Sequence, residues 1–217
     1  MARDLTLVID GSVREQPVVV LVGADGALRG LPEPAPSEVG LLAAVVVALG
    51  AERDRVGALV AVRGPGSYMG VRTGLASALG VAQALSLPLS LVGSLEVVAA
   101  QAEPGQEMAL ALADAGRGGT LGQLMSPETA GPGPARWRAA GPVQLLGRDG
   151  GWPGEWLPAK AVIGSPGQGR QLPPGLGRLL ASRDRRQALA RIVSLGPARV
   201  TGYDLLSADY PESVGAE

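Results

Sequence analysis

Few side chains in this sequence are of the types that carry out chemistry. Its 217 residues include no Cys and no His, so it offers no thiolate nucleophile, no His-based triad and no metal held by His or Cys. Lys160 is the one lysine among 19 basic residues, and no Ser-x-x-Lys spacing ends at it, which leaves a peptidase without a base. An enzyme would have to use carboxylates, Arg, Tyr, Ser or Lys160. The absence of Asn and the excess of Arg over Lys indicate a compositional bias of the source.

Two aspartates are candidate site residues because each ends an apolar run that is typical of a buried strand. Leu5–Asp10 leads into Gly-Ser, and Met108–Asp114 leads into Ala-Gly. Asp10 and Asp114 therefore occupy matching places in two similar segments. The repeated pattern predicts two related halves of about 100 residues each.

The most specific motif runs from Arg63 to Gly74, between a predicted strand at Ala58–Val62 and a predicted helix at Gly70–Leu85. Its glycines and its proline indicate a tight strand-to-helix turn, whose amides could meet an anion. It lacks the lysine of a P-loop, the third glycine of a dinucleotide fingerprint and the flanking glycines of a nucleophile elbow. A structural turn and a binding loop both stay open. The loop residues concerned are Gly64, Pro65, Gly66, Ser67, Gly70 and Arg72.

Two predicted helices are apolar or small on more than one side. The first, Ser37–Leu49, ends at Gly50 and has two apolar faces, and the helix from Gly70 has sides made of small residues. Small side chains let helices approach closely, so these helices need a facing helix. That partner is either the other helix of the same chain or a helix of another protein.

The remaining segments predict short strands, turns and further helices. Gly23–Gly26 is predicted to be a hairpin turn, and Ser94 is predicted to cap a helix. Ser126–Pro174 holds nine of the 18 prolines and is predicted to form loops around short strands. Arg178–Val193 is predicted to be a basic helix, and the tail after Ser207 lacks periodicity. The expected short strands include Leu89–Val92, a segment near Trp137 and Ala161–Ile163.

Charge and hydropathy argue against nucleic-acid and membrane classes. The formal net charge of −1 gives no long-range field that attracts nucleic acid. Thr73–Leu95 carries no charge, but Pro88, Gln83 and serines interrupt it, which favours a buried helix-turn-strand over a membrane span. The first apolar run, Leu5–Ile9, is too short for a signal peptide. We therefore expect a cytoplasmic location and no membrane partner.

Three motifs follow one another in an order and spacing that resembles the TsaB (YeaZ) family. They are Val8-Ile-Asp-Gly-Ser12, Gly64-Pro-Gly-Ser-Tyr-Met-Gly-Val-Arg72 and Val92-Gly-Ser-Leu-Glu96. The family carries A-I-D-T-S, G-P-G-S-F-T-G-V-R and V-S-S-L-E at these places, and its D-A-R segment resembles Asp114-Ala115 with an arginine nearby. The fourth residue of the first motif is Gly11 here, where the family usually has Thr. The resemblance extends over about the first hundred residues.

The resemblance implies an α/β fold of the actin-like ATPase (ASKHA) superfamily, with two RNase H-like lobes. It places an N-terminal lobe with the partner-binding helices at residues 1–103, a smaller C-terminal lobe at 104–206 and a tail at 207–217. Asp10 and Asp114 would then lie on the first strand of each lobe, where catalytic relatives hold metal and phosphate.

The resemblance also implies a non-catalytic scaffold and dimerisation subunit. TsaB proteins bind and activate the catalytic paralogue TsaD, which works with the ATPase TsaE to make N6-threonylcarbamoyladenosine at position 37 of tRNA. The expected partners are TsaD, TsaE, tRNA through the complex, and a second copy when TsaD is absent. No catalytic residue, metal or cofactor of its own is expected, because the partner subunits use the ATP. The expected partner-binding residues are Val39, Leu42, Val46, Val71, Gly74, Ser77, Ala78, Val81 and Ala84.

Two other functions stay open. An active ATP-dependent phosphotransferase of the same fold would use Asp10 and Asp114 as metal-side carboxylates. An RNA-binding module would use the arginines of the predicted helix at Arg178–Val193, which is otherwise a solvated amphipathic helix. Binding of Mg-ATP by the isolated chain would favour the first, and salt-dependent tRNA binding would favour the second.

Overall fold

The computed structural model describes most of the chain in two compact units, which are taken separately below. Unit 1 holds residues 1–94 and 189–209, and unit 2 holds residues 95–188 and 210–217. The described residues are 3–13, 17–29, 40–102, 106–117, 119–128, 136–147, 150–157, 159, 161–164, 171–176, 178–179 and 184–197. The domain boundaries expected from the sequence resemblance stay a prediction.

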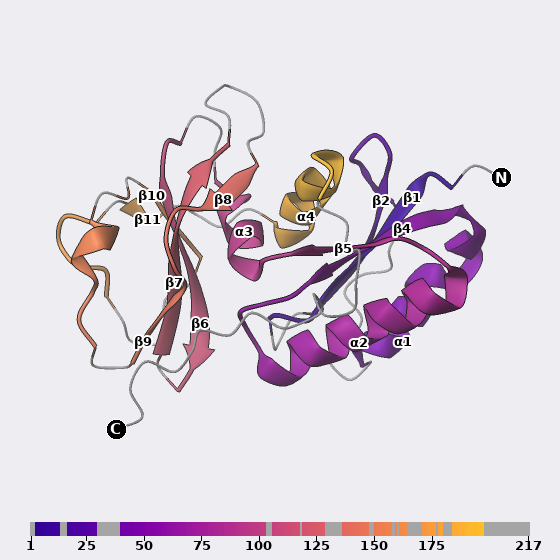
Figure 1. Ribbon diagram of the computed structural model, residues 1–217, viewed down its shortest axis with the longest axis horizontal. Helices are drawn as coiled ribbons and strands as arrows, with labels where there is room; N and C mark the ends of the chain where they lie inside the picture. The colour runs from indigo at the N-terminus through magenta and orange to yellow at the C-terminus, as the bar shows by residue number, and fades with distance from the viewer. Residues whose placement is uncertain are drawn as a thin grey trace. The chain divides into compact units, whose positions relative to one another are not determined.

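Unit 1 is built on a five-stranded sheet with the order β3-β2-β1-β4-β5 (Figure 1). β1 pairs antiparallel with β2 and parallel with β4, which pairs parallel with β5. The turn after β2 closes where Gly-Ala-Asp-Gly predicted it, with a hydrogen bond of 2.9 Å from the amide of Gly23 to the carbonyl of Ala27. The strands are β1 Leu5–Asp10, β2 Val18–Gly23, β3 Leu28–Arg29, β4 Val56–Val62 and β5 Leu89–Val92.

Two helices cover one face of this sheet. α1 spans Leu41–Leu49 and continues into the 3-10 helix η1, Gly50–Arg55, and α2 spans Tyr68–Leu85. The alternate residues of β1 that begin at Leu5 point toward these helices, and they share one core with the helices' inner faces. Figure 1 shows α1 and α2 side by side along the sheet. The core positions on the helices are Leu41, Val45, Ala48, Val71, Leu75, Ala78 and Ala82.

Unit 2 repeats the strand order of unit 1. Its main path is β11-β10-β6-β7-β8, and β9 pairs with β7 beside that path. β6 pairs antiparallel with β7 and parallel with β10, as β1 pairs with β2 and β4. This shared order supports the prediction of two related halves. The strands are β6 Ala109–Gly116, β7 Gly119–Pro127, β8 Trp137–Ala139, β9 Gln144–Leu146, β10 Ala161–Gly164 and β11 Arg178–Leu179.

The core of unit 2 is organised around Trp156, which lies in the 3-10 helix η2, Gly154–Trp156. Its ring lies against Gly122 of β7, where a Cβ atom would overlap the aromatic carbons, so this strand position accepts only glycine. Trp152 meets Trp156 edge to face, with 5.9 Å between the ring centroids. Within the described residues, the chain passes from one unit to the other in α3 Ser94–Ala99 and in α4 Arg185–Ser194.

Most predicted elements are confirmed, and three boundaries are corrected. α2 begins at Tyr68 rather than Gly70, because the Ser67 hydroxyl caps its first turn. α1 begins at Leu41, because Gly40 has ψ 154° and is not helical, and the predicted start at 37–39 lies outside the described residues. The helix predicted over Arg178–Val193 is wrong at its start, because Arg178–Leu179 forms a strand beside β10. The tail after Ser207 lies outside the described residues.

Candidate functional site: a motif junction and an apolar helix face

The first motif forms a closed turn at the end of β1. Asp10 is buried, and its Oδ1 accepts hydrogen bonds from the backbone amide of Ser12 at 2.9 Å and from the Ser12 hydroxyl at 2.6 Å. This is the local bonding by which an aspartate stabilises a turn. In unit 1 the carboxylate therefore holds the chain reversal that ends the strand.

The second motif packs directly onto that turn. The amide of Ser67 donates to the carbonyl of Ser12 at 2.8 Å. A Cβ atom on Gly66 would overlap the Ser12 carbonyl, and one on either Gly11 or Gly70 would overlap the carbonyl of the other residue. These glycines therefore allow two backbone segments to touch, and Gly11 leaves no room for the threonine that the resembled family usually has.

The third motif holds the same loop from its other side. The amide of Ser94 donates to the carbonyl of Gly64 at 2.7 Å, and its hydroxyl donates to the carbonyl of Pro65, which follows a cis peptide bond. The amide of Arg63 donates to the carbonyl of Val92 at 3.0 Å. The three motifs thus meet at the carboxyl ends of neighbouring strands in unit 1, and they fix where α2 begins.

The amides at the start of α2 are largely bonded within the chain, which bears on the two alternatives for this loop. The amide of Gly70 donates to the Ser67 hydroxyl at 3.4 Å, and the amide of Val71 donates to the Ser67 carbonyl at 2.8 Å. The Ser67 amide is also used, as described above. The geometry favours a structural turn over an anion-binding loop, because an anion would need amides that point away from the chain.

The second candidate carboxylate differs from the first in its surroundings. Asp114 is exposed and lies opposite Thr120 in the β6–β7 hairpin, whose strand continues to Gly116. Asp10 and Asp114 belong to different units. Within the described ranges, no group of three or more acidic side chains is placed to hold a metal ion.

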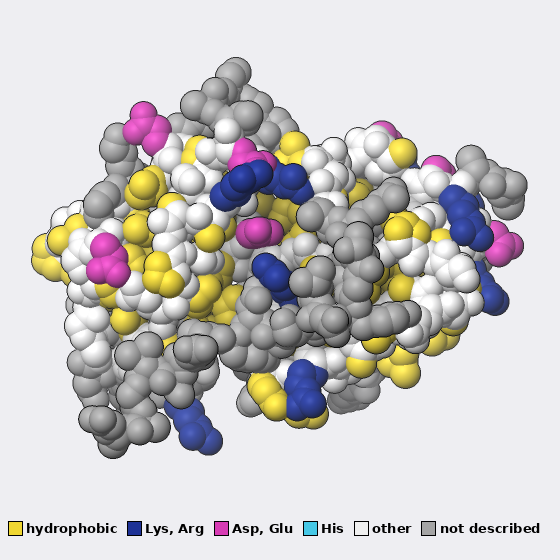
Figure 2. All heavy atoms as spheres, viewed as in Figure 1, with side chains coloured by type: hydrophobic (Ala, Val, Ile, Leu, Met, Phe, Trp, Pro, Cys, Tyr) yellow, Lys and Arg dark blue, Asp and Glu magenta, His cyan; other side chains and the backbone are white. Residues whose placement is uncertain are grey.

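An apolar face lies on the outer side of the two helices of unit 1. The inner side of α1 is buried, whereas Leu42 is 58% exposed and Val46 is 62% exposed. Figure 2 shows hydrophobic side chains along the lower right of the view, over α1 and α2. We define the α1/α2 face by its exposed residues, which are Leu42, Ala43, Val46, Val47, Met69, Thr73, Ala76, Gly80 and Ala84.

The structure divides the predicted partner-binding residues into three groups. Leu42, Val46 and Ala84 are exposed on the α1/α2 face, and Ser77 and Val81 are half-buried beside it. Val39 lies outside the described residues. The assignment of Val71, Gly74 and Ala78 to an accessible interface is corrected, because all three are buried within unit 1. Val71 and Ala78 pack on the sheet, and Gly74 faces the Leu41 side chain at 3.6 Å from an ideal Cβ.

Sequence reasoning missed Val47, Tyr68 and Met69, which are also large and exposed. Tyr68 and Met69 belong to the first turn of α2 rather than to the loop, and Ser67 as an N-cap residue is the sequence signal for that start. The Arg72 guanidinium lies 5.1 Å from the centroid of the Tyr68 ring, and it donates a hydrogen bond to the Tyr68 hydroxyl. The first turn of α2 therefore presents an ordered aromatic and cationic pair.

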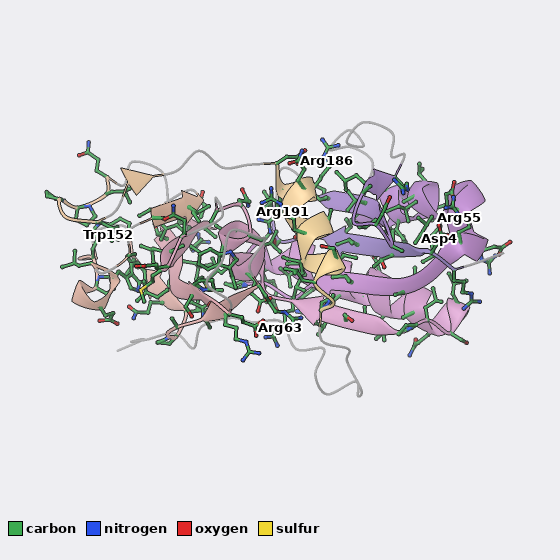
Figure 3. The ribbon with its side chains drawn as sticks, turned by 90° about the horizontal axis from the view of Figure 1, so that it is seen from above. Asp4, Arg55, Arg63, Trp152, Arg186 and Arg191 are labelled. Atoms are coloured by element: carbon green, nitrogen blue, oxygen red, sulfur yellow. The ribbon has the colours of Figure 1, made fainter. Side chains whose placement is uncertain are left out.

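One charged cluster away from this face has a structural role. Arg55 binds Asp4 through two hydrogen bonds of 3.1 and 2.7 Å and Glu52 through one of 2.8 Å (Figure 3). The hydrogen bond from Arg55 lowers the pKa of the Asp4 carboxyl below its usual value. Arg55 thereby connects η1 to the segment before β1.

The basic helix proposed for RNA binding is smaller than expected. In α4, Arg186 and Arg191 are half-buried, and Figure 3 shows both along the helix. Leu189 and its two neighbours are buried, and the Asp184 carboxylate accepts a hydrogen bond of 2.9 Å from the Arg186 amide. Arg178 belongs to a strand, and Arg183 lies outside the described residues. This arrangement favours a packed helix.

Both units have a sheet of the same strand order, in agreement with the actin-like ATPase fold that the sequence resemblance implies. A family model for TsaD, tRNA N6-adenosine threonylcarbamoyltransferase, matches residues 39–123. No curated protein matches the sequence. Within the described residues, no helix is both long and apolar enough to cross a membrane.

Two solved structures resemble the chain over nearly its whole length. YeaZ from Pseudomonas aeruginosa has a TM-score of 0.69 and 23% sequence identity, over 97% of this chain and 100% of YeaZ. An uncharacterized protein with similarity to peptidase YEAZ from Pseudomonas aeruginosa has a TM-score of 0.64 and 22% identity, over 92% of this chain and 95% of that protein. The chain therefore has the fold of YeaZ, in agreement with its sequence resemblance to the TsaB (YeaZ) family.

Proposed function

We propose that this chain is a TsaB-type scaffold subunit that binds and activates a TsaD-type catalytic subunit for the threonylcarbamoyl modification of tRNA. The observation that carries the proposal is the exposed apolar α1/α2 face. α1 contains only Leu, Ala and Val, and more than half of the Leu42 and Val46 surface is exposed. Large exposed apolar patches mark interaction sites, because water disfavours them and a partner can cover them.

The kind of partner is suggested by the segment that the TsaD family model matches. Residues 39–123 include both helices of the α1/α2 face. A partner that resembles this chain over the same segment would present a similar helix pair. Two similar helix pairs can pack face to face in a nearly two-fold arrangement, which buries both apolar surfaces in one bundle.

The remaining parts of the proposal follow from the same scaffold role. TsaE joins the complex, tRNA is bound through the complex, and a second copy covers the α1/α2 face when TsaD is absent. ATP is used by the partner subunits, the chain supplies no catalytic residue, and the complex works in the cytoplasm. Asp10 supports this division of labour, because its Oδ1 is engaged by Ser12 within unit 1.

Co-purification with the TsaD of the same genome tests the proposal. The full chain should bind TsaD, and Leu42→Arg with Val46→Arg should weaken binding at least about tenfold by placing two charges in the apolar contact. Leu145→Arg is a matched control, because Leu145 is similarly exposed but lies on β9 of unit 2. Binding that is unchanged by the double variant would place the interface elsewhere. Full tRNA modification without this chain would remove the scaffold role.

An ATP-dependent phosphotransferase of the same fold is the second candidate, supported by the strand order and by a carboxylate at the corresponding strand of each unit. Calorimetry with Mg-ATP on the isolated chain separates the two functions. Micromolar binding would favour the phosphotransferase, whereas the scaffold role predicts no binding in that range.

A further inference from the structure

Among the α2 residues that belong to the α1/α2 face, Met69 is the one large apolar side chain. It lies nine positions before the buried Ala78, which at about 100° per residue places the two on opposite sides of the helix. The other exposed residues of α2 on the α1/α2 face are Thr73, Ala76, Gly80 and Ala84, all small. Met69 therefore extends beyond a row of small side chains, and it is adjacent in sequence to Tyr68 of the Tyr68–Arg72 pair.

The same residue is the most accessible oxidisable group that the structure describes. The sequence has four methionines and no cysteine. Met69 is 68% exposed, Met108 is half-buried and Met125 is fully buried in β7, while Met1 lies outside the described residues. Oxidation of methionine follows exposure, so a peroxide should reach Met69 well before Met125.

We propose that Met69 is an anchor of the partner-binding face and makes that face sensitive to oxidants. Hydrogen peroxide transfers one oxygen atom to the Met69 thioether, whose sulfur is oxidised to the sulfoxide, while the peroxide is reduced to water. The product keeps the length of the side chain but carries a strongly polar S=O group. This inference rests on the proposed function, because it assigns Met69 to the face that TsaD covers.

The effect on binding follows from desolvation. A thioether adapts to irregular apolar contacts and loses little when it is buried. A sulfoxide oxygen loses its hydrogen bonds to water in an apolar contact unless the partner supplies a donor. Oxidised Met69 should therefore weaken the complex, whereas the folded chain should be unaffected because the side chain lies outside the core.

The experiment treats the full chain alone with hydrogen peroxide, removes the peroxide and then measures binding to TsaD. Peptide mass spectrometry should find sulfoxide at Met69 before Met108 or Met125, and affinity should fall about tenfold, as expected for an interface anchor. Methionine sulfoxide reductase should restore it. Met69→Leu is the matched control, since it should bind as the wild type does and lose the peroxide response. Bound TsaD should slow the oxidation of Met69.

The results separate this inference from the function on which it rests. Wild-type binding that survives complete oxidation of Met69, or a Met69→Leu chain that still responds to peroxide, overturns the role of Met69 and leaves the scaffold intact. Oxidation of Met69 at the same rate with and without saturating TsaD also overturns it. Failure of the unoxidised wild type to bind TsaD overturns both.

Discussion

Unit 1 and unit 2 order their strands alike, but they connect those strands differently. In unit 1, α1 lies between β3 and β4, and α2 lies between β4 and β5. In the described part of unit 2, the connection between β9 and β10 contains only the short helix η2, whose Trp156 fills the core from one side of the sheet. Two sheets of the same strand order are thus covered on one side by different layers, a helix pair in unit 1 and a compact tryptophan cluster in the described part of unit 2.

The two matched aspartates, Asp10 and Asp114, also differ between the units. Asp10 is buried and bonded to Ser12, whereas Asp114 is exposed in the β6–β7 hairpin. A strand that occupies the same place in the sheet therefore gives its aspartate different surroundings in each unit. The helix layer of unit 1 carries the exposed apolar surface, so the proposed partner contact is expected in unit 1 alone.

The largest effect is expected when a charge is placed on the buried side of α2 rather than on its exposed side. Ala78→Arg should unfold unit 1, because Ala78 is fully buried against the sheet and the guanidinium has no room or partner there. Ala84→Arg should leave the fold intact, because Ala84 is exposed. Far-UV circular dichroism reports the loss of helix. Tryptophan emission reports unit 2, since Trp137, Trp152 and Trp156 all lie there. A fully folded Ala78→Arg protein would contradict this account of the core.

This contrast also shows how far the sequence alone could go. The apolar runs correctly predicted β1 and β5, and the predicted end of α2 at Leu85 is confirmed. Helical spacing identified stripes of small residues on α2. It could not decide which stripe faces the sheet, because Val71, Ala78 and Ala84 are all apolar. α1 has the same problem, since it has no polar residue to mark its outer side.

The error at Arg178–Leu179 has a different physical cause. This segment pairs with β10 at Ala161 and Val162, so its conformation depends on a contact between distant parts of the chain. Local periodicity does not contain that information. The motif junction was equally hidden, because nothing in the spacing of Gly11 and Gly70 shows that their backbones touch.

A smaller effect tests the close backbone contact at the motif junction of unit 1. Gly70→Ala should destabilise the protein by about 2–4 kcal/mol, because its Cβ atom would overlap the Gly11 carbonyl, and backbone cannot move aside easily. Gly80→Ala is the matched control in the same helix. Its Cβ atom would meet open space, so it should stabilise the helix by up to about 1 kcal/mol. Urea unfolding measures both, and equal midpoints would contradict the close contact.

The smallest expected effect concerns the exposed ion pair at the edge of unit 1. The lowered pKa of Asp4 means that its pairing with Arg55 stabilises the folded state above the unfolded carboxyl pKa of about 3.9. That contribution is lost as the pH falls through the lower folded pKa. Asp4→Asn should therefore lower the Tm slightly at pH 7 and leave it equal to the wild type at strongly acidic pH. A Tm difference that grows on acidification would contradict the pairing.

The central claim is that the α1/α2 face binds a TsaD-type subunit, and titration calorimetry with purified TsaD measures it most directly. The account predicts saturable binding of TsaD to the wild-type chain, at least about tenfold weaker binding to Leu42→Arg with Val46→Arg, and wild-type affinity for Leu145→Arg. Equal affinities for all three chains, or no binding by the wild type, would contradict it.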